Sequence, residues 1–253
     1  MTADRHLHTR FSTDSNEDPE NCVKQAVKLG MKDIWFTDHY DIDFPDGTFV
    51  FDVDEYFRQL TRLKENYADR IRVHIGVELG LKKDINDKIQ SLISKYPFEY
   101  KIGSVHLVDN KDPYERELFD MPDAEFYRGY FETALECLDA CTGFDTFGHL
   151  DYVVRYGYEK DRTYSYRENA DVIDAILTRL IRRDIALEVN TAGLRKGLKY
   201  AHPYPEILNR YKELGGRKLA LGSDAHRAQD IGAGFGETLA ILNSFKIDHM
   251  EII

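Results

Sequence analysis

Side chains that can bind metal recur along the whole chain, each beside a short β-rich run. The nine candidates are His6, His8, Asp14, His39, Glu78, His106, His149, Asp224 and His226. Because one metal ion needs three or four such ligands, nine of them indicate a site for two or three ions. Ligands this far apart in the sequence require a fold in which the ends of many strands meet. The pattern favours metal-assisted hydrolysis.

Short apolar runs alternate with helical patterns, and this alternation is typical of parallel strands joined by helices. We expect seven strands, at Asp4–His8, Asp33–Asp38, Arg72–Glu78, Tyr100–His106, Asp145–His149, Ile185–Asn190 and Lys218–Ser223. We expect helices at Asp18–Leu29, Val53–Tyr67, Asp84–Lys95, Asp123–Cys141, Glu168–Arg183, Pro203–Leu214 and about Gly236–Phe245.

The places of the candidate ligands distinguish a closed barrel from an open sheet. Every expected strand except the sixth ends at or beside one of them. An open sheet would spread the strand ends along a line, roughly 4.8 Å apart. A closed ring instead brings them towards one centre, where barrel enzymes collect their catalytic groups. The sequence therefore predicts a seven-stranded α/β barrel, formed as a single domain by residues 1–253.

Charge and cysteine content limit the partners and the compartment. A net charge of −11 argues against a general nucleic-acid surface, since phosphate backbones need clustered lysine and arginine. Bound divalent ions would still make the pocket locally cationic and suited to a small phosphorylated substrate. No run is apolar enough for a membrane span, and we expect no secretory signal. An odd number of cysteines (Cys22, Cys137 and Cys141) indicates a reducing, cytoplasmic location. We interpret Cys137 and Cys141 as buried side chains, rather than as a metal or redox pair.

Three further carboxylates lie next to the candidate ligands. They could orient those ligands from behind or have ordinary structural roles, and they are Asp4, Asp38 and Asp151. The other three histidines are not expected to bind metal. His74 lies roughly 13 Å along its strand from Glu78, His202 follows the sixth strand in a loop that could touch substrate, and His249 lies in the tail.

Arginines on the loops after the strands are candidates for binding a phosphate group, which needs a bidentate cation besides metals. Arg155 follows His149, and Arg195 lies in the loop after the sixth strand, which offers no obvious metal ligand. Arg162 and Lys196 are weaker alternatives.

Several stretches of the sequence together have a specific likeness. They are His6-Leu7-His8-Thr9 with Phe11-Ser12 and Asp14, Thr37-Asp38-His39, Gly76-Val77-Glu78, Ile102-Gly103-Ser104-Val105-His106, Gly148-His149-Leu150-Asp151-Tyr152, Glu188-Val189-Asn190-Thr191-Ala192-Gly193-Leu194-Arg195 and Leu221-Gly222-Ser223-Asp224-Ala225-His226. On these, nearly the whole chain resembles the PHP superfamily (polymerase and histidinol phosphatase), and within it the histidinol-phosphate phosphatases. One departure is Arg5, where the family often has an aromatic residue; its side chain should face away from the metals.

The resemblance implies a distorted form of the barrel, PHP-type, with three divalent ions of zinc, iron or manganese. It implies ligand sets of His6, His8, Glu78 and Asp224 for the first metal, of Glu78, His106 and His149 for the second, and of Asp14, His39 and His226 for the third. Arg155, Arg195 and Ser223 would bind the phosphate. The groups expected to act in catalysis are Glu78, Asp224, His226 and Arg195.

The reaction expected from the resemblance is hydrolysis of L-histidinol phosphate to L-histidinol and phosphate, in histidine biosynthesis, by a hydroxide that bridges two metals. The acidic and aromatic loops Tyr40–Phe51 and Leu107–Asp120 could receive the cationic end of the substrate. Three alternatives stay open: a PHP phosphoesterase for another small phosphate ester, nucleotide or cyclic phosphodiester; a metal-dependent amidohydrolase; and a non-enzymatic metal-binding domain.

Overall fold

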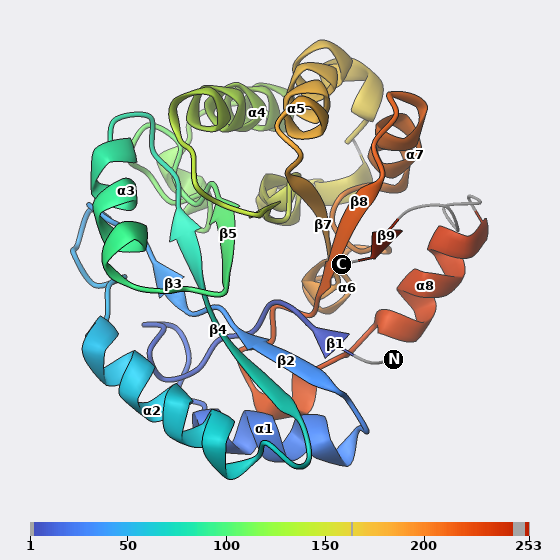
Figure 1. Cartoon of the computed structure of the whole chain (residues 1–253). Helices are drawn as coiled ribbons and strands as arrows, with labels where there is room; N and C mark the ends of the chain where they lie inside the picture. Colours follow the sequence, from blue (N-terminus) through green and yellow to red (C-terminus); the bar gives the residue numbers. More distant parts are fainter. Residues whose placement is uncertain (1–2, 163, 245–250, 253) are drawn as a thin grey trace.

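Seven main strands form a nearly closed parallel barrel in a computed structural model that describes residues 3–162, 164–244 and 251–252. The barrel strands are β1 (Ala3–Asp4), β2 (Asp33–Phe36), β4 (Arg72–Gly80), β5 (Tyr100–Ser104), β6 (Thr146–Phe147), β7 (Ala186–Asn190) and β8 (Lys218–Gly222). They pair in this order, and every ladder between them is parallel. The helices stand outside the strands (Figure 1). The predicted seven-stranded α/β barrel is confirmed.

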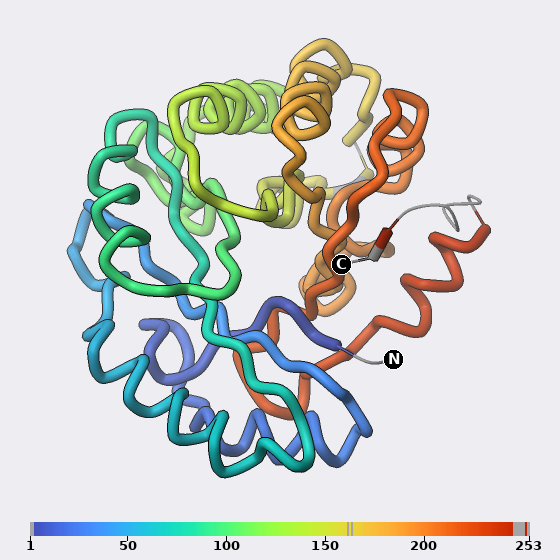
Figure 2. The backbone as a smooth tube through the Cα atoms, viewed as in Figure 1, coloured from blue at the N-terminus to red at the C-terminus, as the bar shows by residue number. Residues whose placement is uncertain are grey.

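The first and last barrel strands meet through the segment that follows β1. Leu7 forms a parallel bridge with Ala225, the His8 N–H donates to the Ala225 carbonyl at 2.8 Å, and the Asp224 N–H donates to the His6 carbonyl at 2.7 Å. Figure 2 shows this dark-blue beginning of the chain beside the orange strand β8. The first strand therefore joins β2 at its start and β8 at its end.

Two short strands that the sequence did not predict distort the barrel. β3 (His39–Tyr40) continues the register of β2 along β4, since Phe36 pairs with Ile75 and His39 with Glu78. β9 (Glu251–Ile252) pairs with the first residues of β8. The expected strand at 33–38 is thus a strand with a break at residues 37–38. There the Thr37 N–H donates to the Leu7 carbonyl at 3.1 Å.

The predicted helices all form, with small differences at their ends. They are α1 (Pro19–Lys28), α2 (Val53–Asn66), α3 (Asn86–Lys95), α4 (Asp123–Ala140), α5 (Ala170–Arg182), α7 (Pro205–Glu213) and α8 (Phe235–Ser244). The expected end of the last helix, Phe245, lies outside the described residues. The short helix α6 (Ala192–Arg195) was not predicted. Single 3-10 turns lie at η1 (Arg116–Leu118), η2 (Tyr152–Tyr156), η3 (Lys160–Arg162), η4 (Tyr166–Asn169) and η5 (Ala228–Asp230).

Local sequence signals account for these helices. The Asp18 carboxylate caps α1 by accepting the Glu20 N–H at 2.8 Å, and Pro19 occupies the first turn, where its missing N–H costs no hydrogen bond. Helix α2 packs apolar side chains inward, with Tyr56 and Leu60 fully buried. None of the described helices is long and apolar enough to cross a membrane.

The three cysteines are buried and unpaired, as the structural interpretation of Cys137 and Cys141 requires. The thiols of Cys137 and Cys141 donate to the backbone carbonyls of Leu81 and Lys82, at 3.5 and 3.1 Å respectively. Burial raises the pKa of Cys137 to about 12, so this thiol is inert.

Candidate metal centre

Glu78, near the end of β4, lies at the centre of the histidines predicted as ligands, and it is fully buried. Its Oε2 is 2.8 Å from Nδ1 of His39, and 3.2 and 3.5 Å from Nε2 of His6 and His8. Its Oε1 is 3.0 and 3.4 Å from Nε2 of His149 and His106. One carboxylate therefore faces two groups of imidazoles, as a bridging ligand would.

The first group of possible ligands consists of His6, His8 and Asp224, whose donor atoms all lie within 4.8 Å of one another. Nε2 of His8 is 3.3 Å from Oδ1 of Asp224. The second group, Glu78, His106 and His149, meets the same distance limit. Both groups are buried, as expected for the first and second metal sites.

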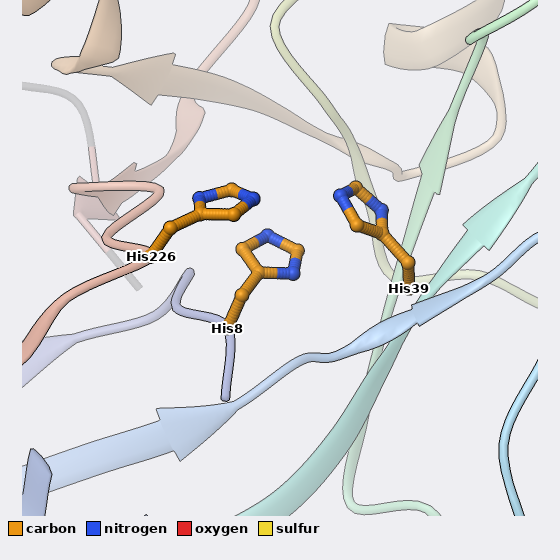
Figure 3. A group of neighbouring side chains, drawn as sticks. All are labelled: His8, His39 and His226. Carbon is orange, nitrogen blue, oxygen red and sulfur yellow. The ribbon is translucent and has the colours of Figure 1, made fainter. Parts of the chain in front are cut away.

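The third group brings together His8, His39 and His226 from three separate strand ends (Figure 3). The rings of His39 and His226 lie 4.1 and 4.2 Å from that of His8, centroid to centroid. Oδ2 of Asp14 is 2.9 Å from Nε2 of His226 and 3.7 Å from Nε2 of His39. All nine predicted ligands thus gather at one end of the barrel.

Several buried polar atoms in this cluster have no hydrogen-bond partner among the described residues. They include Nε2 of His6, Nε2 of His8 and Oε2 of Glu78. Buried polar atoms in proteins are normally satisfied. Unsatisfied donors and acceptors that face one another are what a metal site leaves behind, so the cluster fits divalent ions that accept nitrogen and oxygen ligands, such as zinc.

The charges of the cluster support the same interpretation. Burial opposes the ionised form of Glu78, but the positive charges of His6, His39 and His106 outweigh it and hold its pKa well below the ordinary value. Burial likewise opposes charge on His106, yet Asp41 and then Glu78 raise its pKa to about 10. The negative groups therefore retain a proton on His106, and a bound cation would replace that proton.

Glu188 on β7 orients His6 and was not assigned a role from the sequence. Its Oε1 lies 2.5 Å from Nδ1 of His6, and its Oε2 accepts the backbone N–H of His149 at 2.7 Å. A Cβ on Gly222 would collide with His6 and lie 2.7 Å from Oε1 of Glu188, so only glycine leaves room for this contact. The sequence signal that could have identified Glu188 was the alternation of side chains along a strand, because residues two apart, such as Glu188 and Asn190, point to the same face.

Asp41 plays the same part for His106, with its Oδ2 2.7 Å from Nδ1 of that ring. The sequence placed it only in a loop rich in acidic residues. Asp38, for which two roles were open, has both. It accepts the Thr9 N–H at 2.6 Å and the Ser12 hydroxyl at 2.8 Å, and that hydroxyl lies 3.0 Å from Nδ1 of His8.

Of the two roles that were open for Asp4 and Asp151, the structure shows the structural one. The Asp4 carboxylate accepts backbone N–H groups of His6 and Ser223, at 3.3 and 2.9 Å, so it fixes the chain rather than the His6 ring. Asp151 bonds to Nδ1 of His202 at 2.5 Å, so its carboxylate holds His202 rather than a predicted metal ligand.

The remaining histidines differ in their surroundings. His202 is fully buried and does not line the cavity that opens over the ligand cluster. His74 stacks on Trp35, 4.1 Å between centroids, and lies 2.9 Å from Asp33 on the strand preceding the break, away from the ligand end. His249 lies outside the described residues.

A cavity of about 910 Å³ opens over the ligand cluster. Of the cationic candidates, Arg155, Arg195 and Lys196 line it, whereas Arg162 does not. Ser223, expected to bind phosphate, is fully buried and does not line the cavity. The other lining residues include Asp14, His39, Asp41, Phe44, Phe49, His106, Asp112, Tyr114, His149, Tyr152, Tyr156, Asp224 and His226.

Both arginines present donors that no described residue accepts. Arg195 donates from Nη2 to the carbonyls of Ser223 and Asp224, at 2.5 and 3.2 Å, while its Nη1 is buried without a partner. The Arg155 guanidinium lies 4.2 Å above the Tyr152 ring, and its Nε and Nη1 have no partner. Guanidinium groups with free donors beside a cluster of possible metal ligands suit an anionic group such as a phosphate. Arg5, by contrast, stacks 3.9 Å over Trp35, away from the cavity.

Comparison with known proteins gives a consistent result. The family model described as the PHP domain matches residues 4–192. The chain is 37% identical over 241 residues to a probable histidinol-phosphatase of Clostridium acetobutylicum, covering 94% of this chain and 92% of that one. It is 35% identical over 259 residues to the histidinol-phosphatase of Lactococcus lactis subsp. lactis, covering 97% and 96%.

A solved structure extends the likeness to three dimensions. The crystal structure of histidinol phosphate phosphatase from Lactococcus lactis subsp. lactis, complexed with zinc, L-histidinol and phosphate, matches with a TM-score of 0.88. The two chains are 31% identical, and the match covers 96% of this chain and 93% of that one.

Proposed function

Because this chain belongs to the PHP-domain family, we propose that it is a metal-dependent phosphatase that hydrolyses L-histidinol phosphate to L-histidinol and phosphate. One observation carries this function: Glu78 faces two groups of imidazoles beneath a cavity lined by Arg155 and Arg195, each of which has donors that no described residue accepts. Metal ligands and phosphate-binding cations thus share one site. The solved Lactococcus relative, which contains zinc, L-histidinol and phosphate, supports the same substrate.

The centre binds divalent metal, and we propose three ions, of zinc, iron or manganese. His6, His8, Glu78 and Asp224 would hold one; Glu78, His106 and His149 the second; and Asp14, His39 and His226 the third. His8 also lies within reach of the third group. Such ions lower the pKa of bound water and neutralise charge on phosphate oxygens.

The chain's own residues bind and orient the substrate. Arg155 and Arg195 would grip the phosphate oxygens from two loops and hold the phosphorus over the ligand cluster, where charge redistributes during transfer. Catalysis is then largely positioning and electrostatic stabilisation, carried by Glu78, Asp224, His226 and Arg195. Ser223 is left out of this set, because it does not reach the cavity.

The other end of the substrate carries an amine and an imidazole. Asp112 and Tyr114 line the cavity from one of the predicted acidic loops, and Phe44 and Phe49 from the other. Oδ1 of Asp112 accepts the Tyr114 N–H at 2.8 Å, which leaves the second carboxylate oxygen for a cation. We propose that these residues receive the cationic end.

Steady-state kinetics on the metal-loaded protein tests the substrate. We expect kcat/KM for histidinol phosphate to exceed that for sugar phosphates and nucleoside monophosphates. Equal or better turnover of one of those would reject the substrate but retain the phosphatase. Loss of activity in Arg195→Ala with metal still bound separates an enzyme from a metal-binding domain without catalysis.

A further inference from the structure

A buried pair of side chains joins the loop that carries Arg155 to the loop that carries Arg195. Oδ1 of Asp151 and Nδ1 of His202 lie 2.5 Å apart, and both side chains are fully buried. Neither residue lines the cavity or belongs to a group of possible metal ligands. The pair therefore has no direct contact with substrate or metal.

On one side, Asp151 fixes the start of the turn that presents Arg155. Its carbonyl accepts the Val154 N–H at 3.0 Å, and η2, which contains Arg155, begins at the next residue. The second carboxylate oxygen of Asp151 accepts the Tyr204 N–H at 2.7 Å. This single carboxylate thus binds the segment around residue 202 at two points.

On the other side, His202 supports the helix that ends at Arg195. The N–H and carbonyl of His202 both hydrogen-bond to Asn190 at 2.8 Å. Oδ1 of Asn190 in turn accepts the Ala192 N–H at 2.9 Å, in the first turn of α6. A Cβ on Gly193 would lie 3.3 Å from Cδ2 of His202, so the imidazole packs directly against α6.

We propose that His202 is a positioning residue which, through Asp151, sets the separation of Arg155 and Arg195 so that both grip one phosphate group. The proposal rests on the proposed function for the role of the two arginines. Because they come from different loops, both bind the same phosphate only when the loops keep a fixed distance. A misplacement of about 1 Å can cost a binding or catalytic group up to 10²-fold.

Two substitutions at one position separate the hydrogen bond from the bulk of the ring. In His202→Asn the amide nitrogen takes the place of Nδ1 and still donates to Asp151. In His202→Gln it reaches the place of Nε2, and Asp151 loses its donor. The matched control is His74→Asn, since Nε2 of His74 is also paired with an aspartate, Asp33, at 2.9 Å, but away from the ligand end, and asparagine removes that donor.

The measurements are the dissociation constant of inorganic phosphate, by calorimetry on metal-loaded protein, and the KM and kcat for histidinol phosphate. We expect His202→Gln to weaken phosphate binding and raise KM about tenfold or more at unchanged metal content. We expect His202→Asn to keep most of the affinity and His74→Asn to leave it unchanged. In an Arg155→Ala background, His202→Gln should weaken phosphate binding little further, because only one of the two arginines is then left to bind the phosphate.

Unchanged phosphate affinity in His202→Gln, even with a lowered melting temperature, would overturn the proposal and leave a structural role. The proposal would also be overturned if His202→Gln weakened phosphate binding as much in the Arg155→Ala background as in the wild-type protein. Phosphate binding is measured without histidinol phosphate, so a failure of the proposed substrate would show in turnover alone. The phosphate affinities of the His202 variants would still test the positioning role.

Discussion

Glu188 and His6 meet across 2.5 Å, from Oε1 to Nδ1, although they stand 182 positions apart in the chain. Both are buried, and the contact turns Nε2 of His6 towards Glu78, 3.2 Å from its Oε2. A carboxylate that holds one nitrogen of an imidazole fixes the ring and makes the other nitrogen a stronger metal ligand. The proposed first metal site thus depends on a residue that is not one of its proposed ligands.

We expect Glu188→Gln to weaken metal binding about 10- to 100-fold, because the amide keeps the size of the side chain but loses the charge that orients His6. Competition with a chelator, followed by elemental analysis, measures the effect. Glu99→Gln is the control, since Glu99 lies 3.3 Å from His74 outside the metal centre. Equal metal retention in the two variants would contradict the role of Glu188.

Glu78→Ala should lose at least two ions together, whereas His39→Ala should lose mainly one. The reason is that Glu78 contacts imidazoles of both the first and the second group of possible ligands, while His39 belongs to the third. Metal content per chain after gel filtration distinguishes these outcomes. Single, equal losses from both variants would show that Glu78 does not bridge.

Arg155→Ala and Arg195→Ala should each raise KM and weaken inhibition by inorganic phosphate about 10- to 100-fold, the usual size of a lost hydrogen bond to a charged group. Metal content should not change, because neither side chain belongs to a ligand group. Arg162→Ala is the control, since that side chain is 82% exposed and does not line the cavity. A loss of metal in either cavity variant would mean that the arginine acts on the centre rather than on phosphate.

Metal binding to the metal-free protein should release protons at neutral pH. The pKa of His106 is raised from 6.5 to about 10, against the effect of burial, by Asp41 and Glu78, so this ring carries a proton that a metal must displace. Metal affinity should therefore rise with pH. Calorimetry in buffers of different ionisation enthalpy measures the protons released, and a binding heat independent of the buffer would contradict the prediction.

The raised pKa of His106 has the opposite effect on the stability of the metal-free protein, which should fall as the pH rises. A raised pKa in the folded state means that the pair with Asp41 stabilises most fully below pH 6.5, and that this contribution is lost as the pH rises towards 10. Thermal unfolding of chelator-treated protein across this range measures it. A melting temperature that rises with pH would show that other groups dominate.

The sequence predicted the barrel and the gathering of the candidate ligands, because a histidine or carboxylate at the end of a strand has a place fixed by topology. It did not identify Glu188 or Asp41, since their roles depend on which ring nitrogen they face across the barrel. It assigned Ser223 to phosphate, although that side chain is fully buried and does not line the cavity. Likewise, the break at residues 37–38 arises from contacts with Leu7 that no local pattern encodes.

The hydrogen bonds from Asp224 to His6 and from His8 to Ala225 tie metal binding to the order in which the protein is made. A nascent chain still lacking β8 presents His6 and His8 without their carboxylate partner from residue 224. The proposed first metal site can then form only after almost the whole polypeptide has left the ribosome. Metal bound at that site would therefore mark chains whose barrel has closed.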